Sequence, residues 1–359
     1  MILIKIKHSR ELKKKHWKWF CGILNDSDVW VKNNSANSTQ PINPDLCKQM
    51  TREKFIKTVL KLKTRREIRN IVLANYSAMR KMIKKHPEWV YSQKSSSYGV
   101  EVRDGLKKAF GYEDVFCKTK NSWNAFEFYN SINVDVCPYC NSQPVGADVV
   151  RDEVEHFFPR GLYPFLSITL LNMIPVCKTC NGNKLKHDTY KEEIVYPYKK
   201  EFGKDGQFFI GYDLNAFFQG KKNFKKSLGK AIDFTIKKYD SSPVSRTDIN
   251  NSIKCLKLTS EYKIHAQDQI KNLLVECQSR VVSRASYLSK WNFPREQILK
   301  QLSGGFVSMS KKEHCFRKMR EDVLEQIETY MKIGAVYAVK KNIIKRIMER
   351  LFQRKKVHC

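Results

Sequence analysis

Apolar residues recur at helical spacing between Thr51 and Pro87. Threonine often caps the N-terminus of a helix, and proline commonly ends one. The apolar positions between them lie three or four residues apart, as on one helix face: Phe55, Ile56, Val59, Leu60, Ile68, Ile71, Val72, Met79, Met82 and Ile83. The pattern predicts a long helical region over 51–86, in which the basic run over 61–69 is either a solvated face or a phosphate contact.

Other stretches also have the pattern of regular elements. Residues 1–7 alternate apolar and basic side chains and predict a strand, and 208–212 predict another. We expect a helix over 122–132, and helices from about residue 227 to the end. The clearest, 339–352, has an unbroken apolar stripe beside a basic face. We interpret it as a core-docked helix; a phosphate-binding or partner-docking face is the alternative.

Residues 10–20 combine a predicted helix with interleaved lysines and tryptophans, Trp17 and Trp19 among them. Basic and aromatic side chains together can hold a nucleic acid backbone and stack on bases. The simpler interpretation, which we favour, is an amphipathic helix whose tryptophans pack on the core. The aromatic residues of 100–134 are likewise interpreted as packing residues.

The composition adds a strong positive charge to this picture. The chain has 359 residues and a net charge of +31, from 67 basic and 36 acidic side chains. Such an excess favours a polyanionic partner, nucleic acid before an anionic membrane. No apolar run has the length of a signal peptide or a membrane span, so we expect a soluble, cytoplasmic protein without membrane association. Eleven scattered cysteines suit reduced thiols better than a disulfide framework.

The candidate chemistry lies between residues 137 and 184. Two Cys-x-x-Cys pairs, Cys137 with Cys140 and Cys177 with Cys180, supply four soft ligands for a tetrahedral zinc ion. The spacer between them, residues 141–176, is longer than in a simple two-knuckle zinc motif. We therefore expect zinc to close both ends of an insert. This segment has four basic and four acidic residues, so the positive charge lies in its flanks.

The same segment resembles a known family. Its order is Cys-x-x-Cys, Glu155-His156 with Pro159 three residues on, Asn172, and Cys-x-x-Cys-Asn-x-x-Lys. This set is similar to the HNH endonucleases, although many members have Asp where this chain has Glu155. The resemblance implies a ββα-metal fold around one divalent ion. The run from Glu155 to Asn181 also resembles HNH proteins of bacterial defence loci, including Septu-type partners of ATPases, which implies a regulatory ATPase partner.

The elements of this segment predict where its side chains lie. Residues 149–156 are expected to form one strand and 170–177 a second, and Cys180-Asn181 is expected to open a short helix. Glu155 and His156 alternate along a strand and start on opposite faces, so they converge only if the strand ends there. Asn181 and Lys184 are one helical turn apart on one face.

Phosphodiester hydrolysis needs an activated water, a neutralised phosphate and help for the leaving oxygen. His156 is assigned as the general base, because histidine titrates near neutrality. The resemblance implies that Glu155 and Asn181 bind a catalytic Mg²⁺ or Mn²⁺, and that the products carry a 5′-phosphate and a 3′-hydroxyl. Asn183 and His187 are rival ligands.

Three further residues complete the predicted site. Asn172 is expected to brace the loop that orients His156, and Arg160 and Lys184 are expected to contact phosphate.

These observations predict an α+β protein: a zinc-stapled ββα-metal HNH module over 135–200, within mostly helical basic regions over 1–134 and 201–359. The first hypothesis is a metal-dependent DNA endonuclease in anti-phage defence. The alternatives are a zinc-stabilised nucleic-acid-binding module without catalysis, and a nuclease that cleaves RNA.

Overall fold

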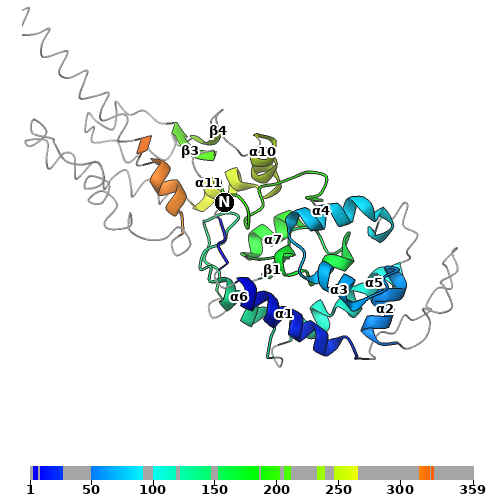
Figure 1. Cartoon of the computed structure of the whole chain (residues 1–359). Helices are drawn as coiled ribbons and strands as arrows, with labels where there is room; N and C mark the ends of the chain where they lie inside the picture. The colour runs from blue at the N-terminus through cyan, green and yellow to red at the C-terminus, as the bar shows by residue number, and fades with distance from the viewer. Residues whose placement is uncertain are drawn as a thin grey trace, which may run out of the picture. The chain divides into compact units, whose positions relative to one another are not determined.

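The structure is a computed structural model that describes residues 3–6, 9–26, 50–91, 100–118, 122–146, 153–185, 187–202, 206–211, 233–238, 246–265, 315–323 and 325–326. The chain divides into two compact units. The first comprises Met1–Gly203, Asp240–Leu258 and Lys311–Cys315, and the second comprises Lys204–Tyr239, Thr259–Ser310 and Phe316–Cys359. The helices and strands are coloured along the chain in Figure 1.

The region from 51 to 86 is three helices rather than one. They are α2 (Arg52–Val59), α3 (Arg65–Val72) and α4 (Tyr76–Lys85). The Thr51 side chain caps α2, as predicted. Two more capping residues divide the region, because Thr64 and Asn75 accept hydrogen bonds from the first turns of α3 and α4. Lys61 takes a left-handed φ of 52° in the first break.

Helix α5 (Val100–Phe110) packs closely on α2 and then turns into η3 (Tyr112–Phe116), a single π-helical turn. A Cβ at Gly105 would lie 2.5 Å from Phe55 Cζ, so only glycine permits this approach. Gly111 has a φ of +69°, which suits glycine, and it redirects the chain between the two elements. This turn places Tyr112 beside the residues of the candidate site.

Helices α1 (Ser9–Ile23) and α6 (Ala125–Ile132) lie together (Figure 1), and Lys15 of α1 pairs with Glu127 of α6. Trp19 contacts His16, Phe20 and Phe116, and Trp17 contacts Phe20 and the guanidinium of Arg69. Both tryptophans are half-buried and pack one side against the protein, which agrees with the simpler interpretation.

A small antiparallel sheet stands among these helices. It consists of β1 (Glu153–His156) and β2 (Met173–Val176), separated by the 3-10 turns η4 (Pro164–Leu166) and η5 (Leu170–Asn172). Helix α7 (Lys178–Lys184) follows directly and contacts β1. The described chain is thus mixed and mostly helical, in agreement with the predicted α+β class.

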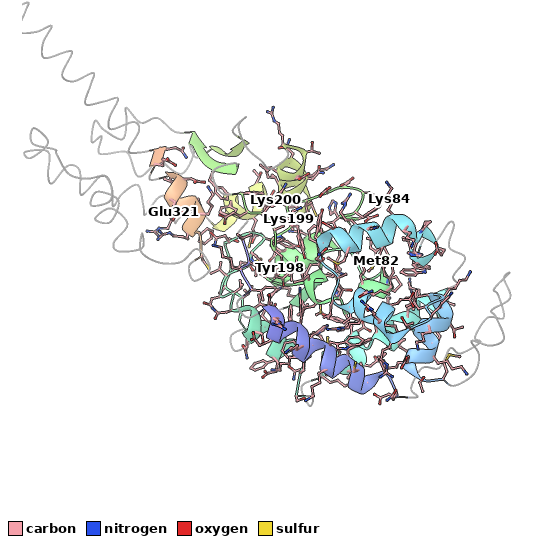
Figure 2. The ribbon with its side chains drawn as sticks, in the orientation of Figure 1. Met82, Lys84, Tyr198, Lys199, Lys200 and Glu321 are labelled. Carbon is pink, nitrogen blue, oxygen red and sulfur yellow. The ribbon has the colours of Figure 1, made fainter. Side chains whose placement is uncertain are left out.

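The remaining elements of the first unit close around this sheet. A 3-10 turn, η2 (Pro87–Trp89), follows α4, and α10 (Arg246–Cys255) returns from far along the chain to accept a hydrogen bond from Val195 N–H at Ser252 Oγ. The hydroxyl of Tyr198, labelled in Figure 2, donates to the Met173 carbonyl over 2.7 Å. The strand predicted over 1–7 is wrong for residues 3–6, where Ile4 N–H instead donates to the Pro197 carbonyl.

The second unit contains a separate antiparallel pair, β3 (Gly206–Gly211) and β4 (Asp233–Lys238). The sequence predicts β3 approximately, but β4 lies where helices were expected. Phe208 of β3 packs on Tyr262 of α11 (Leu258–His265), and its N–H donates to Asp322 Oδ2. The predicted helix over 339–352 lies outside the described residues. No helix in the described ranges is both long and apolar enough to cross a membrane.

Candidate functional site

Four cysteines from two segments meet in the first unit. Cys137 and Cys140 lie in a turn after α6, and Cys177 and Cys180 lie at the start of α7. All four are buried, their sulfurs lie within 4.8 Å of one another, and the Cys140 and Cys177 sulfurs are 3.8 Å apart. Tetrahedral zinc with Zn–S bonds of about 2.3 Å separates its sulfurs by about 3.8 Å, whereas a disulfide brings them to about 2 Å. The cluster therefore fits a structural zinc ion.

The local backbone explains how short segments deliver these thiols. A bridge between Val136 and Pro144 closes the first turn, and Asn141 takes a left-handed φ of 56° inside it. The Ser142 N–H then points at Cys140 Sγ over 3.4 Å. An N–H aimed at the sulfur favours the thiolate that a metal requires.

Helix α7 begins two residues earlier than predicted. Cys177 is its N-cap and Lys178 its first residue, whereas the sequence predicted a start at Cys180. Its sequence, KTCNGNK, contains a glycine and two asparagines and has little intrinsic helix preference. Tertiary contacts must therefore hold α7: the cysteine cluster at its start and the buried Lys184 at its end.

The strand β1 ends at the two residues that carry the predicted chemistry. Glu155 pairs with Ile174 and His156 with Met173 across the sheet. Strand alternation sends their side chains to opposite faces, but the strand stops at His156. Both side chains consequently line one cavity, together with Asn181 of α7.

His156 is held at one ring nitrogen and open at the other. Nε2 lies 2.7 Å from the Ser167 carbonyl oxygen. A carbonyl can only accept, so Nε2 carries the proton and donates it. Nδ1 then keeps its lone pair, and it has no hydrogen-bond partner in the described part of the chain.

Burial lowers the pKa of His156 to about 3, and the nearby charge of Arg160 acts in the same direction. The hydrogen bond to Ser167 opposes this shift, and Lys184 adds a smaller lowering. The imidazole is therefore neutral near pH 7. The prediction that His156 titrates near neutrality is therefore wrong for this structure: the neutral imidazole can accept a proton, but burial makes it a weaker base than a histidine with its ordinary pKa.

Glu155 and Lys184 form a buried ion pair. Lys184 Nζ lies 2.5 Å from Glu155 Oε1 and donates a second hydrogen bond, of 2.8 Å, to the His156 carbonyl. Burial raises the pKa of Glu155, and the Lys184 ammonium limits that rise. The side chain of Lys184 has no exposed surface. Its geometry differs from the predicted phosphate contact, because two internal acceptors enclose the ammonium.

Asn172 is completely buried and ties the loop after β1 to the turn before β2. Its Oδ1 accepts from Phe158 N–H over 2.8 Å, and its Nδ2 donates to the carbonyls of Phe158 and Leu166. The Phe157 N–H donates in turn to the Asn172 carbonyl. These bonds fix the chain on both sides of the turn that positions His156.

The three candidate ligands beyond Cys180 lie in different places. Asn181 and His187 line the cavity, and His187 is 3.7 Å from Glu192. Asn183 instead donates to the Leu256 carbonyl over 3.3 Å. The structure thus separates Asn183 from Glu155, while Asn181 shares the cavity with it. Outside the four cysteines, no group of three or more His, Cys, Asp or Glu side chains among the described residues is arranged to hold a metal.

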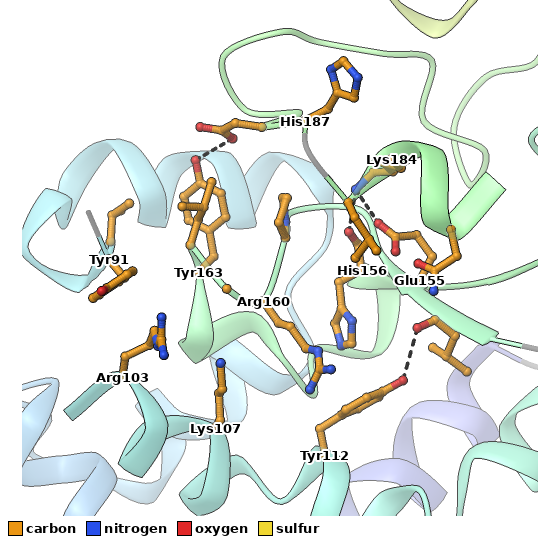
Figure 3. A pocket seen from close by; sticks show the side chains of 18 of the residues that line it. Tyr91, Arg103, Lys107, Tyr112, Glu155, His156, Arg160, Tyr163, Lys184 and His187 are labelled. Carbon is orange, nitrogen blue, oxygen red and sulfur yellow. Dashed lines mark hydrogen bonds and ion pairs between the residues drawn. The ribbon is translucent and has the colours of Figure 1, made fainter. Parts of the chain in front are cut away.

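Arg160 and Tyr112 form the side of the cavity nearest His156 (Figure 3). The Arg160 guanidinium lies 5.1 Å from the centre of the Tyr112 ring and pairs with Glu113. The Tyr112 ring meets the His156 imidazole edge-on at 4.5 Å, and its hydroxyl donates to the Val154 carbonyl over 3.1 Å. The sequence predicted only packing for Tyr112, because nothing in the local pattern links it to a segment 40 residues away.

The cavity has a volume of about 1160 Å³. Its walls come from the turn after β1, from α7, from α5, and from Val90 and Tyr91, which follow η2 (Figure 3). Five of its lining side chains are cationic (Arg103, Lys107, Arg160, Lys184 and Lys191), and two are anionic (Glu155 and Asp188). Two carboxylates outside the lining also pair with these cations, Glu113 with Arg160 and Asp104 with Arg103 and Lys107. A small excess of positive charge remains, which suits an anionic ligand.

Comparison with known proteins adds one partial similarity. The chain is similar to the Septu protein PtuB of Bacillus thuringiensis, with 43% identity over 61 residues. The match covers 17% of this chain and 23% of that relative. No protein-family model and no solved structure matches the chain.

Proposed function

We propose that the chain is a metal-dependent endonuclease of the HNH type, which hydrolyses DNA phosphodiester bonds in bacterial anti-phage defence. One observation carries the proposal. His156 presents the lone pair of Nδ1 in a positive cavity that Glu155 and Asn181 also line, while Nε2 is held by a backbone carbonyl. A purely structural histidine does not need this arrangement.

In the proposed reaction, His156 accepts a proton from water at Nδ1 as the water attacks phosphorus. The P–O3′ bond breaks and the leaving O3′ takes up a proton from solvent, so that the products carry a 5′-phosphate and a 3′-hydroxyl. The Ser167 carbonyl stabilises the imidazolium that forms, because it already accepts from Nε2–H. Arg160 offers the charge that neutralises the phosphate, since its side chain is partly exposed at the cavity.

Glu155 and Asn181 would hold a divalent ion of the Mg²⁺ or Mn²⁺ type. Their carboxylate and amide oxygens are the donors that such hard ions prefer, and Mg²⁺ commonly keeps several waters besides one or two protein ligands. The donor set therefore fits. When bound, the ion would supply charge neutralisation and help for the leaving oxygen. Lys184 would orient the Glu155 carboxylate from the other side.

The proposed defence role and a regulatory ATPase partner rest on the similarity to a Septu protein and to HNH proteins of defence loci. Affinity purification of the tagged chain from its native host tests the partner. We expect a stably bound ATPase; recovery of the chain alone would count against this part of the proposal.

The nuclease is tested with supercoiled plasmid and Mg²⁺ or Mn²⁺, comparing the unchanged protein with His156→Ala. We expect nicking or linearisation by the unchanged protein and its loss in the variant, with zinc content and folding retained. Parallel reactions with RNA distinguish the two substrates. Equal cleavage by both proteins would exclude His156 as the base.

A second candidate function is a zinc-stabilised module that binds nucleic acid without cutting it. The Glu155–Lys184 ion pair favours it, because an internal cation already neutralises the carboxylate expected to bind metal. Isothermal titration with Mn²⁺ distinguishes the two functions. If the chain is a nuclease, the titration should detect a metal site that the Glu155→Gln variant lacks. If it is a silent binding module, no such site should be detected.

A further inference from the structure

The cavity has a second cationic wall outside the four-cysteine segment. Tyr91, Arg103 and Lys107 line it, the last two from α5. Figure 3 shows Arg103 and Lys107 rising from α5 toward the space that Arg160 and His156 also face. The Tyr91 N–H donates to the Leu162 carbonyl over 2.8 Å, which ties this wall to the loop after β1.

Arg103 and Lys107 are four residues apart on one face of α5, and a single carboxylate holds both. Asp104 Oδ1 accepts from Arg103 Nε over 2.9 Å and from Lys107 Nζ over 3.3 Å, and Asp104 Oδ2 accepts from Arg103 Nη2 over 3.3 Å. The Arg103 guanidinium also lies 4.5 Å from the centre of the Tyr91 ring. One edge and one face of the guanidinium are therefore fixed before any ligand binds.

This trio carries two positive charges and one negative charge. A guanidinium has five N–H donors, and the contacts with Asp104 use those on Nε and Nη2. Arg103 and Lys107 therefore keep donors for a ligand at the cavity. An arginine that is fixed before binding loses little conformational freedom when it contacts phosphate.

We propose that Arg103 and Lys107 bind the phosphodiester backbone of a nucleic acid strand, beside the phosphate that is attacked by the water His156 activates. This inference rests on the proposed function, and it extends the substrate site to a helix outside the nuclease-like segment. The ligand class is a polynucleotide. In this proposal the wall formed by α5 and the wall beside His156 contact different phosphates of one strand, and a mononucleotide lacks the second phosphodiester. DNA and RNA share this backbone chemistry.

The chain contains a matched control for this proposal. Lys108 follows Lys107 on the same helix but is exposed and does not line the cavity. Lys107→Gln and Lys108→Gln therefore make the same change in charge at neighbouring positions. Only the first removes a charge from the cavity wall. Asp104→Asn makes the opposite change, because it removes the anion that holds both cations.

The experiment measures the dissociation constant of the full chain for fluorescent DNA and RNA oligonucleotides, without Mg²⁺ or Mn²⁺, over a series of salt concentrations. For Lys107→Gln and Arg103→Gln we expect binding weakened about tenfold, and a slope of log K against log salt reduced by about one. Lys108→Gln should stay within about twofold of the unchanged protein, and Asp104→Asn should bind more tightly. Equal melting temperatures establish that the variants are folded.

The proposal is overturned if the unchanged protein binds neither polymer, or if Lys107→Gln and Lys108→Gln weaken binding equally. Because no cleavage is measured, the result does not depend on the nuclease reaction: a failed plasmid assay with a specific Lys107 effect would reject catalysis and keep this binding wall.

Discussion

Two buried histidines in the first unit make the same bond in different surroundings. His16 Nε2 lies 2.8 Å from the Ile168 carbonyl, and His156 Nε2 lies 2.7 Å from the carbonyl of the preceding residue, Ser167. The other ring nitrogen distinguishes them. His16 Nδ1 accepts from Trp123 Nε1 over 2.9 Å, whereas His156 Nδ1 lacks a partner in the described ranges.

The comparison separates a structural histidine from a candidate catalytic one. The region around His16 is enclosed by the rings of Trp19, Phe116 and Trp123, and both ring nitrogens are satisfied there. The region around His156 opens into a cavity with charged walls. A buried imidazole with a low pKa is common to both, so burial and pKa do not identify the base. The feature that identifies the candidate base is the lone pair of His156 Nδ1 at the cavity.

The largest effect is expected from removing the zinc site, which would disturb the loop that both histidines contact. Cys177→Ser should unfold the cysteine-rich segment, since structural zinc contributes about 10–16 kcal/mol in small zinc folds. Zinc content and thermal unfolding measure the change. Cys255→Ser is the control, because Cys255 is buried but lies outside the cluster. Unchanged zinc content in the Cys177 variant would contradict the assignment.

A second variant affects only the His156 side of the comparison. Lys184→Met leaves the Glu155 carboxylate buried without its partner and releases the His156 carbonyl. We expect the free energy of unfolding to fall by about 3–5 kcal/mol. Adding Glu155→Gln should recover much of that loss, because the unpaired charge is then gone. Urea unfolding of the two single variants and the double variant tests this; additive losses would mean that the ion pair has no special role.

The pH dependence of stability tests the His16 side. Burial lowers the pKa of His16 to about 4 from 6.5, while its bond to Ile168 acts in the opposite direction. At a pH between these two pKa values, the unfolded chain binds more protons than the native chain. The free energy of unfolding therefore rises with pH in this range, and the contribution of His16 reaches its full value above about pH 6.5. The full contribution is about 3 kcal/mol.

His16→Gln should reduce the pH dependence of urea unfolding between pH 4 and 6.5 without abolishing it, because the buried His156, whose pKa is also lowered, contributes over the same range. An unchanged slope in the His16 variant would show that some other group causes the pH dependence.

The smallest effect is expected from Tyr112→Phe. The change keeps the ring against His156 and under Arg160, and removes the hydroxyl's hydrogen bonds with the Val154 carbonyl and with the Cys117 side chain. We expect the free energy of unfolding to fall by about 1 kcal/mol. We also expect Tyr112→Phe to reduce cleavage more than Cys117→Ser, a change at a neighbouring residue, does. Unaltered cleavage and stability together would mean that the bond to the Val154 carbonyl does not position β1.

The sequence predicts the features that depend on spacing along the chain. The pairs Cys137–Cys140 and Cys177–Cys180 predicted the cluster, since two ligands on one turn need only fixed local geometry. Thr51 predicted a helix start for the same reason. The contacts that decide the candidate site connect distant segments instead. Tyr112 reaches His156 through the turn at Gly111, and His16 reaches Ile168 across 152 residues. No local pattern contains those distances.

Lys184 shows why residue type alone was misleading. A lysine beside a predicted phosphate site suggests a phosphate contact, but its position at the end of α7 directs the ammonium to Glu155 and to the His156 carbonyl. The cations at the cavity that keep exposed surface, such as Arg103 and Lys107, come from a helix that the motif does not include. Basic residues of the flanking regions therefore line the candidate site because the fold brings α5 beside it.

The most direct measurement places the two histidines side by side. His156→Ala and His16→Ala are compared for Mg²⁺-dependent plasmid cleavage and for thermal unfolding. We predict that His156→Ala abolishes cleavage while retaining zinc and a cooperative unfolding transition, and that His16→Ala lowers the melting temperature but still cleaves at temperatures where it is folded. Cleavage that survives in a folded His156→Ala protein would contradict the central claim.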